Sequence, residues 1–152
     1  MKYYIAYGSN LNTDQMAYRC PDSEAVGWGV LEDYELVFNG VLTIRPAPGE
    51  SVPVGIWKVT KEDEQSLDVY EGFPRLYRKE TMKVQVTDWE GKTKTRKAIV
   101  YIMNENRRAE NPPTQFYYDT VVSGYLDFNF PVDVLNDAVR RSAKAARNRR
   151  YA

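Results

Sequence analysis

The first sixty residues alternate short apolar runs with turn signals, a pattern typical of β-strands. Asn39-Gly40 separates two such runs and favours a β-hairpin. Segment 46–49, which contains Pro and Gly, predicts a loop. One short helix is predicted from Thr13, a suitable N-cap, to Arg19, before Pro21. The strands predicted in this part of the chain are residues 2–7, 25–32, 34–38, 41–44 and 54–59.

Longer elements follow in the second half of the chain. Thr60 begins a helix with Asp63 in an imperfect capping box, and Gly72 supplies its C-cap before Pro74. Glu90-Gly91 joins two long predicted strands. These strands cover 77–89 and 93–103, and they are followed by a loop over 104–114 and a helix over 116–126. A last helix is indicated by apolar residues at helical spacing, namely Val132, Leu135, Val139, Ala143 and Ala146.

About seven strands and four helices are therefore predicted, without a strict alternation of the two. The two long strands of the second hairpin argue against a doubly wound parallel sheet, so we expect an α+β fold built on a mixed or closed sheet. A length of 152 residues favours one domain that covers 1–152.

Charge is balanced overall but uneven along the chain. The 21 basic and 21 acidic residues cancel, yet the last thirteen residues carry six positive charges and no acid. Positive charge at the end of a helix favours the helix dipole. Because the remainder carries 15 basic and 21 acidic residues, we expect neither a nucleic-acid partner nor binding to a membrane surface.

The numbers of cysteine and histidine residues exclude several kinds of catalytic and metal site. Cys20 is the only cysteine, so it cannot form an intrachain disulfide, and no secretory signal or membrane-length apolar run is visible. We therefore expect a cytoplasmic protein. The chain has no histidine, which excludes a Ser-His-Asp triad, a Cys-His pair and a His-ligated metal. An enzyme with this composition would use a carboxylate as general base, with lysine or tyrosine as the alternative.

Two stretches are candidates for a site. Tyr7-Gly8-Ser9-Asn10-Leu11 lies between a predicted strand and a predicted helix, where a tight turn would leave N–H groups free to bind a carboxylate or an oxyanion. The alternative is an ordinary turn. The second candidate is Glu71, at the end of the helix that begins at Thr60. The field of the helix end would raise its pKa if it is buried, as a general base or acid requires, whereas an exposed glutamate would have no role.

Taken in order, these stretches resemble the gamma-glutamylcyclotransferase-like superfamily. The matching residues are Tyr7-Gly8-Ser9-Asn10-Leu11, Met16, Arg19-Cys20-Pro21, Leu67-Asp68, Glu71-Gly72-Phe73-Pro74, Tyr77-Arg78, Tyr117 and Gly124. The resemblance implies a mixed, partly closed β-barrel flanked by helices. It also implies that Glu71 is the catalytic acid and base, and that the turn from Tyr7 to Leu11 borders the substrate cavity. The late substrate-binding tyrosine is matched to Tyr117, with Tyr118 as the alternative.

The reaction implied by this resemblance is cyclisation of a γ-glutamyl group to 5-oxoproline with release of the attached amine. No metal and no cofactor are implied. The superfamily is functionally mixed, so three alternatives stay open: a cyclotransferase acting on γ-glutamylamines, an enzyme that removes a γ-glutamyl protecting group, and a binding module without turnover. The oligomeric state is left open.

Overall fold

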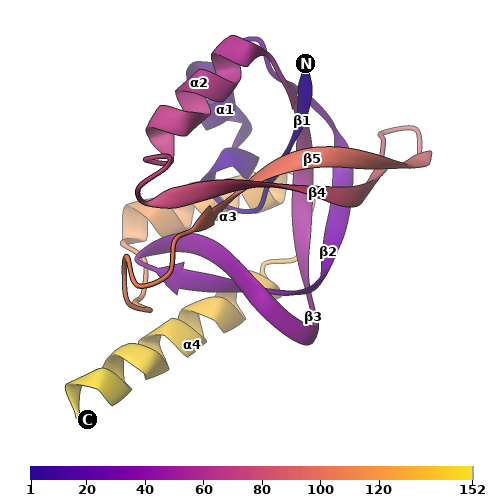
Figure 1. Cartoon of the computed structure of the whole chain (residues 1–152). Coiled ribbons are helices and arrows are strands. Elements are labelled where there is room, and N and C mark those ends of the chain that lie inside the picture. Colours follow the sequence, from indigo (N-terminus) through magenta and orange to yellow (C-terminus); the bar gives the residue numbers. More distant parts are fainter. Residues whose placement is uncertain (152) are drawn as a thin grey trace.

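The computed structural model describes residues 1–151 and contains a closed five-stranded barrel (Figure 1). The order around the barrel is β1-β3-β2-β4-β5. All neighbouring pairs are antiparallel except β1 and β5, which pair in parallel and close the barrel. The predicted α+β fold with a mixed barrel is therefore confirmed. The strands are β1 (Lys2–Ala6), β2 (Glu24–Asn39), β3 (Val41–Val59), β4 (Tyr77–Thr87) and β5 (Thr93–Met103).

Five strands replace the seven that the sequence predicts, because the second and third strands are long and irregular. Asp33 has a positive φ of 65°, and the register shifts there, so β2 continues through the bulge that the sequence pattern divides. The predicted loop 46–49 lies inside β3, so that prediction is wrong. Within it, Gly49 has a φ of 85° and donates its N–H to the Asp33 carboxylate at 3.0 Å. A side chain far away in sequence thus holds this segment to the sheet.

The backbones of β2 and β4 approach closely where these strands cross. These strands share a single bridge, Trp28 with Thr87. A Cβ atom on Gly27 would lie 2.3 Å from the Thr87 carbonyl oxygen, and one on Gly29 would lie 2.6 Å from the Gln85 carbonyl oxygen. Only glycine permits the two strands to approach this closely.

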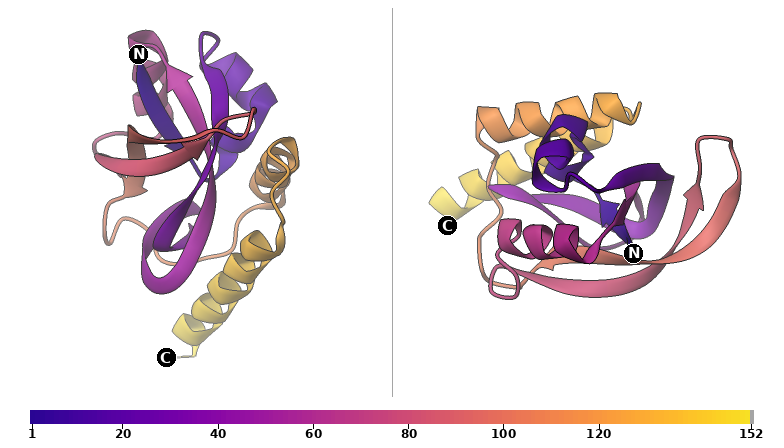
Figure 2. Two further views of the ribbon diagram at one scale, coloured as in Figure 1. Left: turned by 90° about the vertical axis from the view of Figure 1, so that its right-hand side faces the viewer. Right: turned by 90° about the horizontal axis from the view of Figure 1, so that it is seen from above.

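Helices cover the outside of the barrel (Figures 1 and 2). A 3₁₀ helix, η1 (Ser9–Leu11), follows β1 directly. The α-helices are α1 (Thr13–Arg19), α2 (Lys61–Tyr70), α3 (Gln115–Asp127) and α4 (Asp133–Arg150).

The starts of α1 and α2 agree with the sequence rules, with one correction. In α2 the capping box of Thr60 and Asp63 is present as predicted. In α1 the N-cap is Asn12, not Thr13, because the Asn12 side chain accepts the Gln15 N–H at 3.0 Å. Asn12 also donates to the Thr120 carbonyl at 3.1 Å, which connects the start of α1 to α3.

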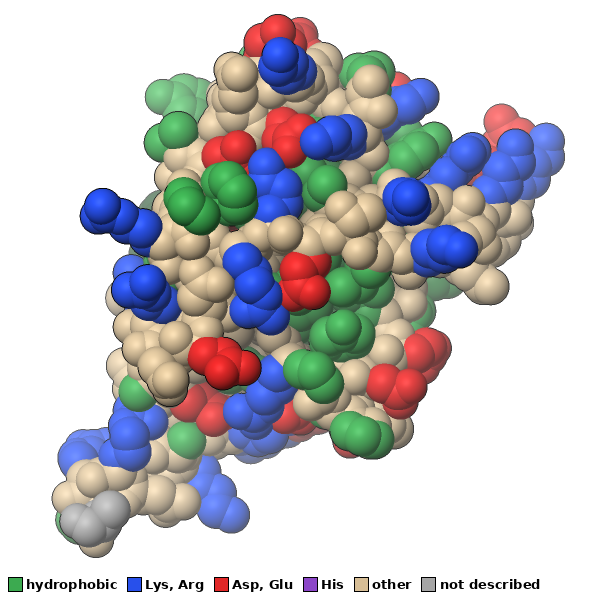
Figure 3. All heavy atoms as spheres, viewed as in Figure 1, with side chains coloured by type: hydrophobic (Ala, Val, Ile, Leu, Met, Phe, Trp, Pro, Cys, Tyr) green, Lys and Arg blue, Asp and Glu red, His purple; other side chains and the backbone are tan. Residues whose placement is uncertain are grey.

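The last helix extends beyond the barrel (Figures 1 and 2). Near its start it buries Leu135, Ala138 and Ser142. Basic side chains gather around its far end, at the lower left of Figure 3. Among residues 1–151, no helix combines the length and the apolar composition needed to cross a membrane.

Candidate active site

The turn after β1 carries free backbone donors. Leu11 donates its N–H to the Gly8 carbonyl at 3.0 Å, which closes the 3₁₀ turn. The N–H groups of Gly8, Ser9 and Asn10 have no hydrogen-bond partner among residues 1–151. Gly8 has a φ of −133°, so it is not required for a left-handed backbone. A Cβ there would lie 3.3 Å from Leu42 Cδ1 and 3.4 Å from the Tyr117 hydroxyl oxygen, so a small side chain would need only a slight shift of Leu42.

Glu71 is the C-cap of α2, one position beyond the last helical residue, Tyr70. The helix ends in a Schellman motif: Phe73 donates to the Asp68 carbonyl at 2.9 Å, and Gly72 to the Val69 carbonyl at 3.1 Å. Gly72 has the left-handed φ of 62° that this motif requires. The motif fixes the direction in which the chain leaves the helix and therefore the position of Glu71.

The environment of Glu71 disfavours its charged form. Burial raises the pKa of Glu71 from 4.5 to about 7, and the positive charge of Arg19 lowers it in part. A carboxyl group with this pKa exchanges a proton readily near neutral pH, as acid–base catalysis requires.

One cavity of about 250 Å³ brings the two sequence stretches together. The cavity is lined both by the turn residues Tyr7, Gly8, Ser9 and Asn10 and by Glu71, which is more than sixty residues further along the chain. The complete lining is Tyr4, Tyr7, Gly8, Ser9, Asn10, Val41, Leu42, Tyr70, Glu71, Leu76, Tyr77, Tyr101, Arg108 and Tyr117.

Two of the predicted assignments are clarified by this geometry. Leu11 does not line the cavity; its side chain is fully buried in the core, where it lies against Gly55 and Gly124. Tyr117 lines the cavity, whereas the hydroxyl of Tyr118 bonds to Asn136 on α4 at 2.5 Å. Tyr117 is therefore the tyrosine of this pair that can reach a ligand.

Tyrosine hydroxyls hold the cavity wall by bonds to the backbone. Tyr7 donates to the Tyr101 carbonyl at 2.6 Å, and Tyr77 donates to the Leu42 carbonyl at 2.5 Å. Tyr117 accepts the Leu42 N–H at 3.0 Å. Burial raises the pKa of Tyr7, Tyr77 and Tyr117, so these hydroxyls stay neutral and serve as hydrogen-bond partners, not as bases.

Arg19 connects the two sequence stretches, a role that sequence reasoning missed. Its guanidinium donates to the Asn10 side chain and lies 3.4 Å from the centre of the Tyr70 ring. The Tyr70 hydroxyl in turn lies 2.7 Å from Ser9 Oγ. These contacts suit Arg19 to positioning Asn10 relative to Tyr70. In the sequence, the only indication of this role was that Arg19 belongs to the matched Arg19-Cys20-Pro21 motif. Within the described part of the chain, no group of three His, Cys, Asp or Glu side chains could hold a metal ion.

Comparisons with known proteins agree with this geometry. A family model described as "Gamma-glutamyl cyclotransferase, AIG2-like" matches residues 4–120. Gamma-glutamylcyclotransferase of Homo sapiens is 30% identical over 143 residues, which cover 86% of this chain and 73% of that protein. A solved structure titled "Gamma-glutamyl cyclotransferase" superposes with a TM-score of 0.73 at 27% identity, covering 90% of this chain and 85% of that one. YkqA from Bacillus subtilis shares the fold, with a TM-score of 0.72 at 18% identity over 95% of this chain and 55% of its own.

Proposed function

Because the chain belongs to the gamma-glutamyl cyclotransferase, AIG2-like family of enzymes, we propose that it cyclises the γ-glutamyl group of a small molecule to 5-oxoproline, with Glu71 as general acid and base. The relatives that carry the name gamma-glutamylcyclotransferase support a cyclotransferase reaction. The residues of the cavity support the assignment of roles within it.

The proposed reaction is intramolecular. The α-amine of the γ-glutamyl group attacks its own γ-carbonyl carbon, a five-membered lactam forms, and the bond from that carbon to the attached nitrogen breaks. The enzyme therefore mainly holds the bent conformer and moves protons. The Glu71 carboxylate accepts a proton from the attacking amine, and the resulting acid donates a proton to the leaving nitrogen.

The turn after β1 supplies the electrostatic part of the proposal. The free N–H groups of Gly8, Ser9 and Asn10 would bind a substrate carboxylate or the oxyanion that develops on the γ-carbonyl. Tyr7 and Tyr117 would contact the γ-glutamyl group, since both residues line the cavity. Leu11 would not contact the substrate; its buried side chain would anchor the turn in the core.

One observation carries this proposal above the others. The proton-exchanging carboxyl of Glu71 and the free donors of the turn line the same 250 Å³ cavity, and neither could perform the reaction alone. A base without an oxyanion site, or the reverse, would not favour acyl transfer over simple binding.

The test is a screen of γ-glutamyl amino acids and γ-glutamylamines, with 5-oxoproline release and thermal shift measured on the same sample. We expect at least one compound to release 5-oxoproline and its amine in equal amounts. Stabilisation by these compounds without release of product would instead identify a binding module. Glutamate release without 5-oxoproline would indicate hydrolysis and would contradict the cyclisation.

A further inference from the structure

A second cavity of about 450 Å³ meets the first at Arg108. Neighbouring residues divide between the two: Leu42 and Tyr77 line the first, whereas Thr43 and Arg78 line the second. This division follows from the strand geometry, in which successive side chains point to opposite faces. Arg108 lines both cavities, so it lies at the rim where they meet.

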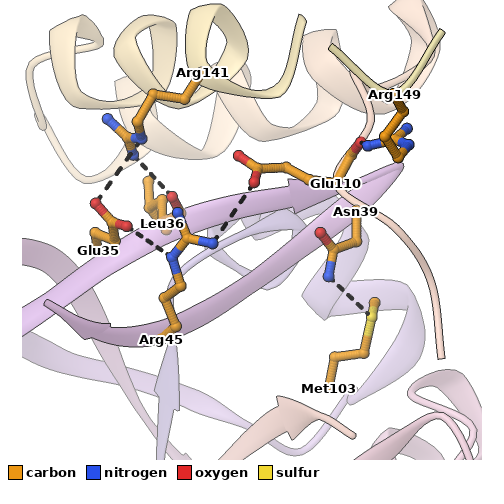
Figure 4. Close-up of polar contacts among 8 residues, drawn as sticks. All are labelled: Glu35, Leu36, Asn39, Arg45, Met103, Glu110, Arg141 and Arg149. Atoms are coloured by element: carbon orange, nitrogen blue, oxygen red, sulfur yellow. Dashed lines mark hydrogen bonds and ion pairs between the residues drawn. The ribbon is translucent and has the colours of Figure 1, made fainter. Parts of the chain in front are cut away.

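Arg108 differs from the other two arginines of the second cavity because its charge is not compensated. Arg45 is paired with Glu35 at 2.7 Å and with Glu110 at 3.6 Å (Figure 4). Arg78 is paired with the carboxylate of Glu80, also on β4, at 2.8 Å. No carboxylate among residues 1–151 forms an ion pair with Arg108. An uncompensated guanidinium at a cavity rim is suited to binding a carboxylate.

The field of Arg108 extends into the first cavity. Arg108 and Tyr77 line this cavity together. Burial raises the pKa of the Tyr77 hydroxyl, and the positive charge of Arg108 acts on it in the opposite direction, as expected for two groups that share one lining. Glu105 and Glu110, the acidic residues on either side of Arg108 in sequence, line only the second cavity, and Glu110 is paired there with Arg45.

The size of the first cavity also bears on the ligand. At about 250 Å³ it is smaller than the sites of about 300–1,000 Å³ that enclose drug-sized ligands. A γ-glutamyl group seated at Glu71 and the turn would place the attached amine elsewhere along the lining. Apart from Glu71, Arg108 is the charged residue of that lining, so it is the group available to a charge on the leaving amine.

We propose that Arg108 binds a carboxylate on the leaving group and so is the residue of this chain that selects among leaving groups. The inference rests on the proposed cyclotransferase function and adds a specificity-determining residue to it. Arg108 takes no part in proton transfer; it determines specificity.

A matched pair of substrates isolates this contact. γ-Glutamylalanine and γ-glutamylethylamide share the same γ-glutamyl group, but only the first has a carboxylate on its leaving amine. Wild-type protein should show the higher kcat/KM with γ-glutamylalanine. Arg108→Gln should lower kcat/KM for γ-glutamylalanine about tenfold, the lower end for a hydrogen bond between charged groups, and leave γ-glutamylethylamide within about twofold. Arg107→Gln is the control, because Arg107 lies beside it in the same segment and lines neither cavity.

Each outcome decides between separate claims. An equal loss on both substrates would show that Arg108 serves the γ-glutamyl part, and no loss on either would show that it binds neither part; both results overturn the inference and leave the proposed function intact. Equal wild-type kcat/KM for the two substrates would also overturn it. Absence of 5-oxoproline from both substrates and from the wider screen would overturn the proposed function and the inference together.

Discussion

Replacing Glu71 with glutamine should stabilise the folded protein at alkaline pH and leave its stability unchanged at acidic pH. Burial raises the pKa of Glu71 from 4.5 to about 7. The folded protein therefore holds this proton more tightly than the unfolded chain, and wild-type stability should fall as pH rises from about 4.5 through 7. Below pH 4.5 the carboxyl is protonated in both states, so glutamine gains nothing there.

The magnitude follows from the same two values. A pKa change from 4.5 to about 7 corresponds to about 3 kcal/mol against the charged form. Glu71 is partly exposed to solvent in the cavity, and solvent screens its charge, so about 3 kcal/mol is an upper limit. For a chain of this length, about 1–3 kcal/mol corresponds to a rise in Tm of roughly 2–10 °C.

The assay is thermal unfolding of wild type and Glu71→Gln at pH 4 and pH 9. The matched control is Glu50→Gln, which removes an exposed carboxylate on β3 and should follow wild type at both pH values. Equal Tm values for Glu71→Gln and wild type at pH 9 would refute the claim that burial disfavours the charge. Equal gains at pH 4 and pH 9 would refute its electrostatic origin.

Three further outcomes are expected. The kcat/KM for cyclisation should fall about tenfold per pH unit below about pH 7, because the Glu71 base becomes protonated; a flat profile from pH 5 to 7 would contradict this. Cys20→Ala should keep activity within a few-fold, since the thiol is buried, its pKa is raised to about 11 by burial, and it lies 3.6 Å from the Asp63 carbonyl; loss of turnover in folded protein would contradict this. Gly124→Ala should destabilise the protein by about 1–3 kcal/mol in urea unfolding, because the new Cβ would lie 2.6 Å from backbone atoms of Leu11 and Asn12. Ser123→Ala, at the exposed neighbouring position, should be nearly neutral.

Local rules were sufficient for the features that depend on a few adjacent residues. The capping box of Thr60, the hairpin at Asn39-Gly40 and the helix end at Gly72 all follow from residue types at fixed short spacings. The same rules placed Glu71 at a helix end, which made it a candidate before its surroundings were known.

Features held by distant residues could not be predicted from one sequence. Within β3, Gly49 donates a hydrogen bond to Asp33, which lies on the neighbouring strand β2. The role of Arg19 depends on its contacts with Asn10 and Tyr70, which the fold brings together from two motifs. No periodicity in the chain encodes such contacts, so the Pro and Gly residues of segment 46–49 led to the prediction of a loop there.

The proposed role of Glu71 implies that one substitution should remove turnover and leave binding in place. Gln preserves the shape and the hydrogen-bonding reach of Glu but cannot accept the proton of the attacking amine. Loss of general acid–base catalysis typically costs about 10²–10⁴-fold in rate. Binding of the γ-glutamyl group should persist, because the free N–H groups of the turn from Gly8 to Asn10 are unchanged.

The most direct measurement is therefore 5-oxoproline formation and ligand-induced thermal shift on the same Glu71→Gln sample, with Glu50→Gln in parallel. We predict that Glu71→Gln is folded, is stabilised by a γ-glutamyl substrate about as much as wild type, and forms 5-oxoproline at least about a hundredfold more slowly. A folded Glu71→Gln protein that binds substrate and forms 5-oxoproline at nearly the wild-type rate would show that Glu71 is not the base.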